Sequence, residues 1–424
     1  MKSRMYRCVA AVAVCGVLAM LAVVSSLATP VAAEEGAADA VAEKAPAGEK
    51  EKAGKDQAGK AKEKTRPQIQ MAILLDTSSS MAGLINQART QLWDVVNELA
   101  ATKRGGQRPD VKVALFEYGK NSLPEEDGFT RLVVPLTTDL DKISEELFAL
   151  QQSRPNSSER CGQVIDRAVR DLKWSENSRD LKCIFIAGNE AFTQGPVDFR
   201  KACQAAADRG ITISTIFCGG LQQGRSLLWA EGAKLADGSF MSIDHNQAVP
   251  DVEAPQDAEL ARLNAELNKS YVAYGASDKR DEFRRRQLTQ DANAARAAPA
   301  AAAARAEFKS SDAYRNEERD LVDGYLAGKV KVEELPKDQL PKELQELKPD
   351  ERKKYIEKKA KARAAVQEKI KQLTAQRNQY IAAEREKLRG ATDRTLGKVL
   401  VEAARKQADA KQFRRDPPPK SAKE

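Results

Sequence analysis

The segment Asp76-Thr77-Ser78-Ser79-Ser80 carries the residue types and spacing in this sequence that are best suited to chemistry. One carboxylate and two hydroxyls, from Asp76, Ser78 and Ser80, stand at alternate positions, so a loop can direct three hard oxygens at one point. Oxygen ligands of this kind suit Mg²⁺, Mn²⁺ or Ca²⁺ better than zinc. Asp and Ser also cap helices well, so the alternative is that these residues only start a helix.

Other kinds of active site find little support in the sequence. His245 is the single histidine, which excludes a Ser-His-Asp triad and a multi-His zinc site within one chain. No Gly-rich phosphate loop and no Cys/His cluster is present. A hydrolase built on Asp76 and Glu159 is the remaining enzyme hypothesis, but such carboxylate pairs more often serve structure or a metal. We therefore predict that the protein is not an enzyme.

The elements that position the Asp76 loop are short strands alternating with amphipathic helices over residues 67–275. The loop follows an apolar run at 69–75 and precedes a helix with Leu84, Leu92 and Leu99 near helical spacing. Such alternation predicts an α/β fold, a doubly wound and mostly parallel sheet with helices on both faces. Ligands bind at the carboxyl edge of such sheets. A helix over Leu260–Tyr271 is expected to close the domain near residue 275.

The loop and its surroundings resemble the von Willebrand factor type A (VWA) family, in which Asp76–Met81 is similar to the metal-ion-dependent adhesion site. The resemblance extends over about residues 67–250, and three phrases are similar to those of bacterial exported VWA proteins with a helical C-terminal extension. They are residues 84–88, 184–190 and 192–196. The resemblance implies a Rossmann-like fold, a divalent cation (Mg²⁺, with Mn²⁺ or Ca²⁺ as alternatives), and a protein partner whose acidic side chain completes the metal.

The sequence departs from the family at two ligand positions. Aligned on Gly162, the family Thr falls at Glu159, and the family Asp falls at Gly188. Two hypotheses remain open: acidic residues supply the missing charge in a rearranged site, or the site has decayed and the domain binds without metal. The implied metal set is Asp76, Ser78, Ser80 and Glu159, with Ser158, Asn189 and Glu190 as further candidates.

Residues 1–33 have the pattern of a signal peptide. Basic residues precede an apolar run over residues 8–27, and Val31-Ala32-Ala33 is suited to cleavage. The alternative is an uncleaved anchor, because the run approaches the roughly 20 residues that a bilayer needs. No other stretch could span a membrane, so no transmembrane domain would remain after cleavage. Either hypothesis predicts an exported protein, which is periplasmic, cell-surface or secreted, or membrane-anchored if the signal is retained.

The rest of the chain is polar. Residues 34–66 are predicted to be a flexible Ala/Glu/Lys linker, residues 276–350 a polar connector with short helices, and residues 351–424 a basic helical tail with 22 Lys/Arg against 10 Asp/Glu. The tail has an apolar seam too broken for a firm coiled-coil prediction. It could bind an anionic envelope surface, or be only a solvated helix. Nucleic acid is not expected, because base-stacking aromatics are scarce there.

Four cysteines follow the predicted signal: Cys161, Cys183, Cys203 and Cys218. Export would allow disulfides, and four cysteines permit three pairings. The VWA topology places Cys161 and Cys218 at the same sheet edge, so a bridge between them is our hypothesis, with Cys203 as a rival partner for Cys218. The alternative is that each is a small buried hydrophobic residue.

The function predicted from the sequence is a non-enzymatic extracytoplasmic module that binds a protein partner through the cation site. The alternative is a structural or scaffolding envelope protein, whose basic tail binds an anionic surface or self-associates and whose metal site has decayed.

Overall fold

The computed structural model describes residues 66–152, 158–246, 252–387 and 395–415. The predicted signal peptide, and the predicted linker up to residue 65, lie outside the described residues. None of the helices within the described residues combines the length and the apolar character that crossing a membrane requires.

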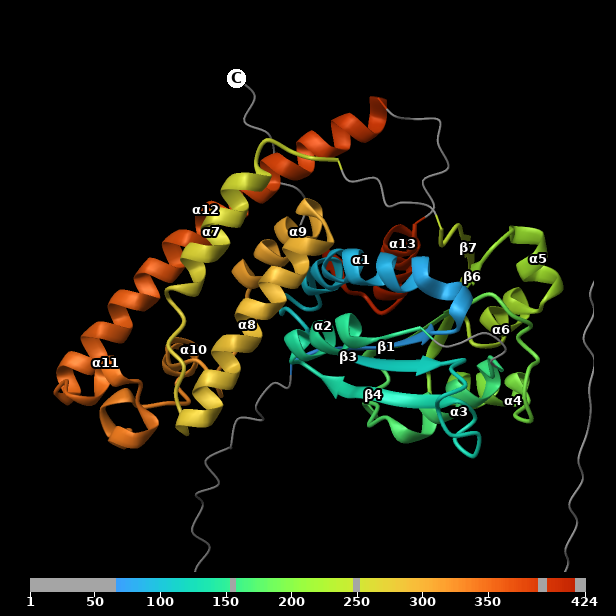
Figure 1. Ribbon diagram of the computed structural model, residues 1–424, viewed down its shortest axis with the longest axis horizontal. Helices are drawn as coiled ribbons and strands as arrows, with labels where there is room; N and C mark the ends of the chain where they lie inside the picture. The colour runs from blue at the N-terminus through green and yellow to red at the C-terminus, as the bar shows by residue number, and fades with distance from the viewer. Residues whose placement is uncertain (1–65, 153–157, 247–251, 388–394, 416–424) are drawn as a thin grey trace, which may run out of the picture. The chain divides into compact units, whose positions relative to one another are not determined.

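A six-stranded sheet forms the centre of the α/β region (Figure 1). Its strands are β1 (Gln68–Asp76), β3 (Asp110–Tyr118), β4 (Thr130–Thr137), β5 (Leu181–Gly188), β6 (Thr212–Cys218) and β7 (Phe240–Ile243). They lie in the order β4-β3-β1-β5-β6-β7, and all neighbours are parallel except β3 and β4. The predicted doubly wound, mostly parallel sheet is confirmed.

Helices cover both faces of this sheet. The elements between the strands are the 3₁₀ turn η1 (Ser79–Met81), α1 (Ala82–Ala100), α2 (Leu140–Ala149), α3 (Cys161–Asp171), α4 (Phe199–Asp208), α5 (Leu221–Ser226) and α6 (Trp229–Leu235). Side chains of α1 and α2 share one buried apolar cluster with the sheet, and those of α3, α4 and α6 share the other. Because β1 is buried on both faces, residues 71–75 form a continuous apolar run instead of alternating with polar residues.

A helical region follows the sheet. Its elements are α7 (Asp257–Asn268), α8 (Ser277–Ala297), α9 (Pro299–Ser310), α10 (Leu321–Leu326), η2 (Val332–Glu334), η3 (Lys337–Gln339), α11 (Lys342–Gln345) and α12 (Pro349–Lys387). The predicted tail helix is present as α12, which has 39 residues. The expectation of only short helices before residue 350 is wrong, since α8 alone has 21 residues.

The predicted closing helix of the α/β domain packs elsewhere. Leu260, Leu263 and Leu267 of α7 are buried against α9 and α12, not against the sheet. An apolar face at helical spacing shows that a helix is buried but not where, so the expected closure near residue 275 was wrong in its packing.

The helix that covers the sheet next to α1 comes from the end of the chain. α13 (Leu396–Ala410) packs along α1 and buries Leu396, Val399 and Leu400 in the same cluster as β1. The Gln91 side chain on α1 donates to the Thr395 hydroxyl at 2.9 Å and accepts from the Gly397 amide at 2.6 Å. The alternative that the basic tail is only a solvated helix is therefore wrong for α13.

Two smaller features complete this contact. A Cβ added at Gly397 would lie 2.5 Å from the Gln91 Cβ, so the two helices approach as closely as they do because residue 397 is glycine. Just beyond α13, the short strand β8 (Arg414–Arg415) pairs antiparallel with β2 (Thr102–Lys103). We propose that the α/β domain consists of residues 67–246 together with α13, and that the helical region is inserted between them.

Candidate functional site

Three strand ends meet at the carboxyl edge of the sheet, and this meeting point contains the Asp76 loop. Asp76 is the last residue of β1 and pairs in register with Tyr118 at the end of β3. On the other side, Leu75 pairs with Ala187, which places Gly188 beside Asp76. The Thr77 amide donates to the Tyr118 carbonyl at 2.9 Å, which extends the hydrogen bonding between β1 and β3 to the first residue of the loop.

The loop after Asp76 gathers oxygens instead of capping a helix. The Ser78 amide donates to Asp76 Oδ1 at 2.7 Å, and the hydroxyls of Ser78 and Ser80 are 3.1 Å apart. Ser78 precedes η1 and Met81 precedes α1, but neither side chain makes a capping hydrogen bond. The simple helix-cap interpretation therefore does not account for these hydroxyls.

Glu159 brings a second carboxylate to the same place. It lies just before α3, is 5% exposed, and is fixed by its amide, which donates to Gln194 Oε1 at 2.9 Å. Asp76 is fully buried. Asp76 Oδ2 and Glu159 Oε2 are both buried without a hydrogen-bond partner, and neither carboxylate forms an ion pair within the described residues. Buried carboxylate oxygens without a donor or cation are costly, so this pair requires explanation.

Two glycines give the carboxylates their space. Gly119 has a φ of +74°, and a Cβ there would lie 2.8 Å from both Asp76 Oδ1 and Glu159 Cγ. At Gly188 a Cβ would lie 2.4 Å from the Tyr118 hydroxyl and 3.2 Å from Asp76 Oδ2. Tyr118 therefore fills the space beside Gly188, the position where the family pattern has an Asp, and no side chain fits there.

The electrostatics of the pair follow from its burial. Burial, then the hydrogen-bonding contact and the charge of Glu159, raise the pKa of Asp76 well above its usual value. Burial is also the largest cause that raises the pKa of Glu159, with the charge of Glu190 adding to it while contacts with Asp76 and Ser78 oppose it. The Tyr118 hydroxyl donates to the Ala187 carbonyl at 3.0 Å and thus stays protonated without serving either carboxylate.

The three further candidates differ in position. The Asn189 amide nitrogen donates to the Ser80 hydroxyl at 3.3 Å, and its Oδ1 is buried without a partner, so Asn189 joins the cluster. Glu190 is exposed and accepts from Gln194 at 3.3 Å. The Ser158 hydroxyl accepts from Arg160 at 3.4 Å and makes no contact with the pair.

The side-chain atoms at this edge that could ligate a metal are oxygens. No group of three or more His, Cys, Asp or Glu side chains suited to a metal lies within the part of the chain that the structure describes. Beside the two carboxylates lie the hydroxyls of Ser78 and Ser80, which are 3.1 Å apart, and the Asn189 side chain, whose nitrogen donates to the Ser80 hydroxyl. Sequence reasoning missed Tyr118 and Gly119. A glycine directly after a buried strand that ends in a tyrosine is the signal that could have indicated them.

The cysteine hypothesis is not met in the structure, where all four cysteines are buried free thiols. Cys161 packs in the cluster of α3 and α4, with its thiol 3.8 Å from the Tyr118 hydroxyl. Cys218 packs in the cluster on the opposite face of the sheet, with Ile216 and Ile243. Sharing a sheet edge is not enough for a disulfide when the two side chains point to opposite faces.

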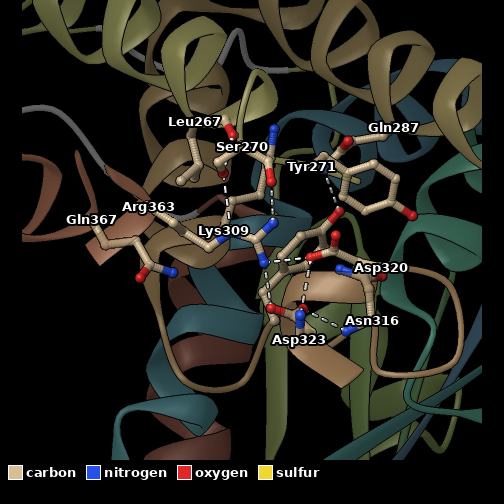
Figure 2. Close-up of a pocket in the computed structure, with 11 residues that line it drawn as sticks. Leu267, Ser270, Tyr271, Gln287, Lys309, Asn316, Asp320, Asp323, Arg363 and Gln367 are labelled. Atoms are coloured by element: carbon tan, nitrogen blue, oxygen red, sulfur yellow. Dashed lines mark hydrogen bonds and ion pairs between the residues drawn. The ribbon is translucent and has the colours of Figure 1, made fainter. Parts of the chain in front are cut away.

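A second polar site lies within the helical region, in a small pocket (Figure 2). Arg363 of α12 lies at its base, with hydrogen bonds to Ser270 and ion pairs to Asp320 and Asp323. Lys309 donates to Asp291 at 2.8 Å from the same wall. Here each buried carboxylate has a cation beside it, which is the arrangement of a structural network.

Part of the α/β region matches a known protein family. Residues 70–228 match the von Willebrand factor type A domain. No curated protein matches the chain. Similar solved structures include the conserved hypothetical protein BatB from Bacteroides thetaiotaomicron, with 18% identity, coverage of 42% of this chain and 90% of that one, and a TM-score of 0.33.

Two further solved structures have the same coverage of this chain. The SpRpn10 VWA domain is 17% identical, covers 42% of this chain and 88% of its own, and has a TM-score of 0.31. An aerotolerance-related membrane protein from Bacteroides fragilis is 15% identical, covers 42% and 92%, and has a TM-score of 0.28.

Proposed function

Residues 70–228 of this chain are a von Willebrand factor type A domain, and on this premise we propose that the protein is a non-enzymatic, cation-dependent binding module for another protein. VWA domains commonly act in protein interaction. The residues at the sheet edge include carboxylates, hydroxyls and an amide but no base paired with a nucleophile, so they can ligate and bind more readily than they can catalyse.

The observation that carries this proposal is the pair of unpartnered buried oxygens, Asp76 Oδ2 and Glu159 Oε2. A hard divalent cation such as Mg²⁺ fits them, because oxygen ligands including carboxylates are its preferred partners. Asp76, Glu159, Ser78 and Ser80 would hold it, with Asn189 beside them. When bound, the cation supplies a coordination position that an oxygen of the partner can take.

Thermal unfolding of the full chain in EDTA, Mg²⁺, Mn²⁺ and Ca²⁺ tests the proposal. A cation at 100-fold over its Kd should stabilise the wild type by about 2.7 kcal/mol. Asp76→Asn keeps an acceptor for the Ser78 amide but removes the charge, so it should lose this response and unfold at a higher temperature than wild type in EDTA. Identical curves for wild type in all four conditions would end the cation hypothesis.

An extracytoplasmic location is part of the proposal. Its support is the signal-like pattern of residues 1–33. N-terminal sequencing of protein recovered from the cell envelope and the medium should find a chain that begins at Glu34. Recovery of the intact N-terminus from the cytoplasm would contradict this location.

A second candidate function is attachment of the chain to an anionic envelope surface through α12. Lys354, Lys358 and Lys361 are exposed at helical spacing, and none forms a hydrogen bond or ion pair with the described residues. Co-sedimentation of the full chain with phosphatidylglycerol vesicles, but not with phosphatidylcholine vesicles, and its loss in high salt are the expected results.

A further inference from the structure

The loops around the candidate cation site carry an excess of negative charge. These edge loops are residues 119–129, 158–160, 189–198, 219–220 and 244–246, all within the described residues. Their exposed carboxylates are Glu125, Glu126, Asp127, Glu190, Asp198 and Asp244. The side chains of Glu125 and Asp127 are 72% and 52% exposed, so this charge faces the solvent and any approaching molecule.

The two cations within these described loops, Lys120 and Arg160, each lie beside a carboxylate. Lys120 lies 3.9 Å from the buried carboxylate of Glu117, which Arg131 also contacts at 2.6 Å. Arg160 lies 2.8 Å from Glu125 and stacks on the Phe129 ring at 4.7 Å. Arg167 of α3 lies 3.6 Å from Asp127. The exposed carboxylates of these loops that form no ion pair with the described residues are therefore Glu126, Glu190, Asp198 and Asp244.

With a divalent cation bound, the candidate site would have no net positive charge. A divalent cation would carry two charges, which Asp76 and Glu159 balance one for one. Glu190 lies on the same rim, since the Gln194 side chain donates to the Glu190 carboxylate at 3.3 Å and accepts from the Glu159 amide at 2.9 Å. A partner carboxylate would thus add a further negative charge to a neutral site with an acidic rim, and like-charge juxtaposition opposes binding.

We propose that the partner of this domain is a basic protein surface that ligates the cation with a neutral oxygen, such as a hydroxyl, amide or carbonyl, and not with a carboxylate. This inference rests on the proposed binding function and deepens it. It replaces the acidic partner that the family resemblance implies, because the charges of these loops favour Lys and Arg around the contact.

The test is selection of a random 12-residue peptide display library on the immobilised full chain in Mg²⁺, with parallel selections in EDTA and on Asp76→Asn. Peptides that bind only in Mg²⁺ should be enriched in Lys and Arg and depleted in Asp and Glu. Their association with the double variant Glu126→Lys/Asp127→Lys should be about tenfold slower. The matched control Glu343→Lys/Glu346→Lys makes the same charge change in the helical region and should leave association unchanged.

The outcomes separate this inference from the function on which it rests. Cation-dependent peptides that require Asp or Glu would overturn the basic partner but leave the binding module intact. Peptides that bind equally in EDTA and to Asp76→Asn would overturn the cation-dependent function and the inference with it. Equal slowing by both double variants would also overturn the inference, since it would show a general charge effect instead of recognition at the edge loops.

Discussion

Two clusters of buried carboxylates, one around Asp291 in the helical region and one at the sheet edge, have opposite surroundings. In the helical region, Asp291 accepts from Arg305 and Lys309 at 2.8 Å each, and although burial acts against ionisation, these charges lower its pKa to about 2. At the sheet edge, Asp76 and Glu159 have no cation beside them within the described residues, and burial raises both pKa values.

The difference supports our proposal that the sheet edge is the functional region. A sequence that balances Asp141, Asp291 and Asp320 with Arg or Lys can evidently compensate buried charge where structure requires it. The uncompensated pair, in contrast, stores an electrostatic cost that a bound cation would relieve. Local strain or imbalance of this kind is found where binding offsets it.

The largest loss of stability is expected when the contact of α13 with α1 and the sheet is disrupted. Leu400→Asp places a charge in the cluster shared by α13, α1 and the sheet, where Leu400 is 6% exposed. The cost should exceed about 5 kcal/mol, comparable with the whole stability of a domain, and truncation after Lys387 should act similarly. Circular dichroism melts should lose their cooperative transition. Exposed Glu402→Asp serves as the control; a normal melt of Leu400→Asp would refute this role of α13.

Breaking the compensated network should have the next largest effect. Arg305 is fully buried, pairs with Asp141 and Asp291, and stacks over Trp93 at 4.7 Å. Arg305→Met keeps much of the volume but leaves both carboxylates short of a cation, so urea unfolding should show a loss of about 3–5 kcal/mol.

An exposed ion pair provides the control for this loss. Arg262→Met removes the pairs with Glu259 and Glu266 on the surface and should cost less than about 1 kcal/mol. Equal losses from Arg262→Met and Arg305→Met would mean that the buried network is not a structural element.

The order of strands and helices could be predicted because periodicity is a local property of the sequence. The packing of α13 could not, since its apolar positions indicate a buried helix but not that its partner α1 lies some 300 residues earlier. For the same reason α7 was assigned to the wrong neighbour. Only the tertiary contacts with α9 and α12 determine its position.

The site was partly predictable for a related reason. Asp76, Ser78 and Ser80 could be placed together because they stand at alternate positions of one loop, and the family alignment added Glu159. The space that Tyr118 takes beside Gly188 depends on side-chain volume, which no spacing rule gives. The opposite faces of Cys161 and Cys218 depend on side-chain direction, which the topology alone leaves open.

Glu307 in the helical region extends the comparison to the pH dependence of stability. Burial, with the charge of Asp94, raises the pKa of Glu307 to about 7. A raised carboxyl pKa means that the folded state binds the proton more tightly than the unfolded state does. The contribution of Glu307 to the stability of the fold is therefore full below about pH 4.5 and is lost as the pH rises through 7. Glu307→Gln should abolish up to about 3 kcal/mol of this decline between pH 5 and 8, measured by urea unfolding. Parallel pH profiles for wild type and Glu307→Gln would contradict this assignment.

The smallest expected effect concerns the sheet edge itself. Glu159→Gln tests whether the buried pair of Asp76 and Glu159 destabilises the fold when no cation is bound. Glu159→Gln removes one of two adjacent buried charges, so in EDTA it should stabilise the chain by about 1–2 kcal/mol, which is the reverse of the usual effect of a core substitution. In Mg²⁺ the sign should invert, since wild type gains stability from the cation and the variant has lost half of the balancing charge. Glu190→Gln, which changes an exposed carboxylate nearby, should shift neither value by more than about 0.5 kcal/mol. A Glu159→Gln variant that is destabilised in both EDTA and Mg²⁺ would show that Glu159 serves the fold, and the contrast between the two regions would then lose its functional meaning.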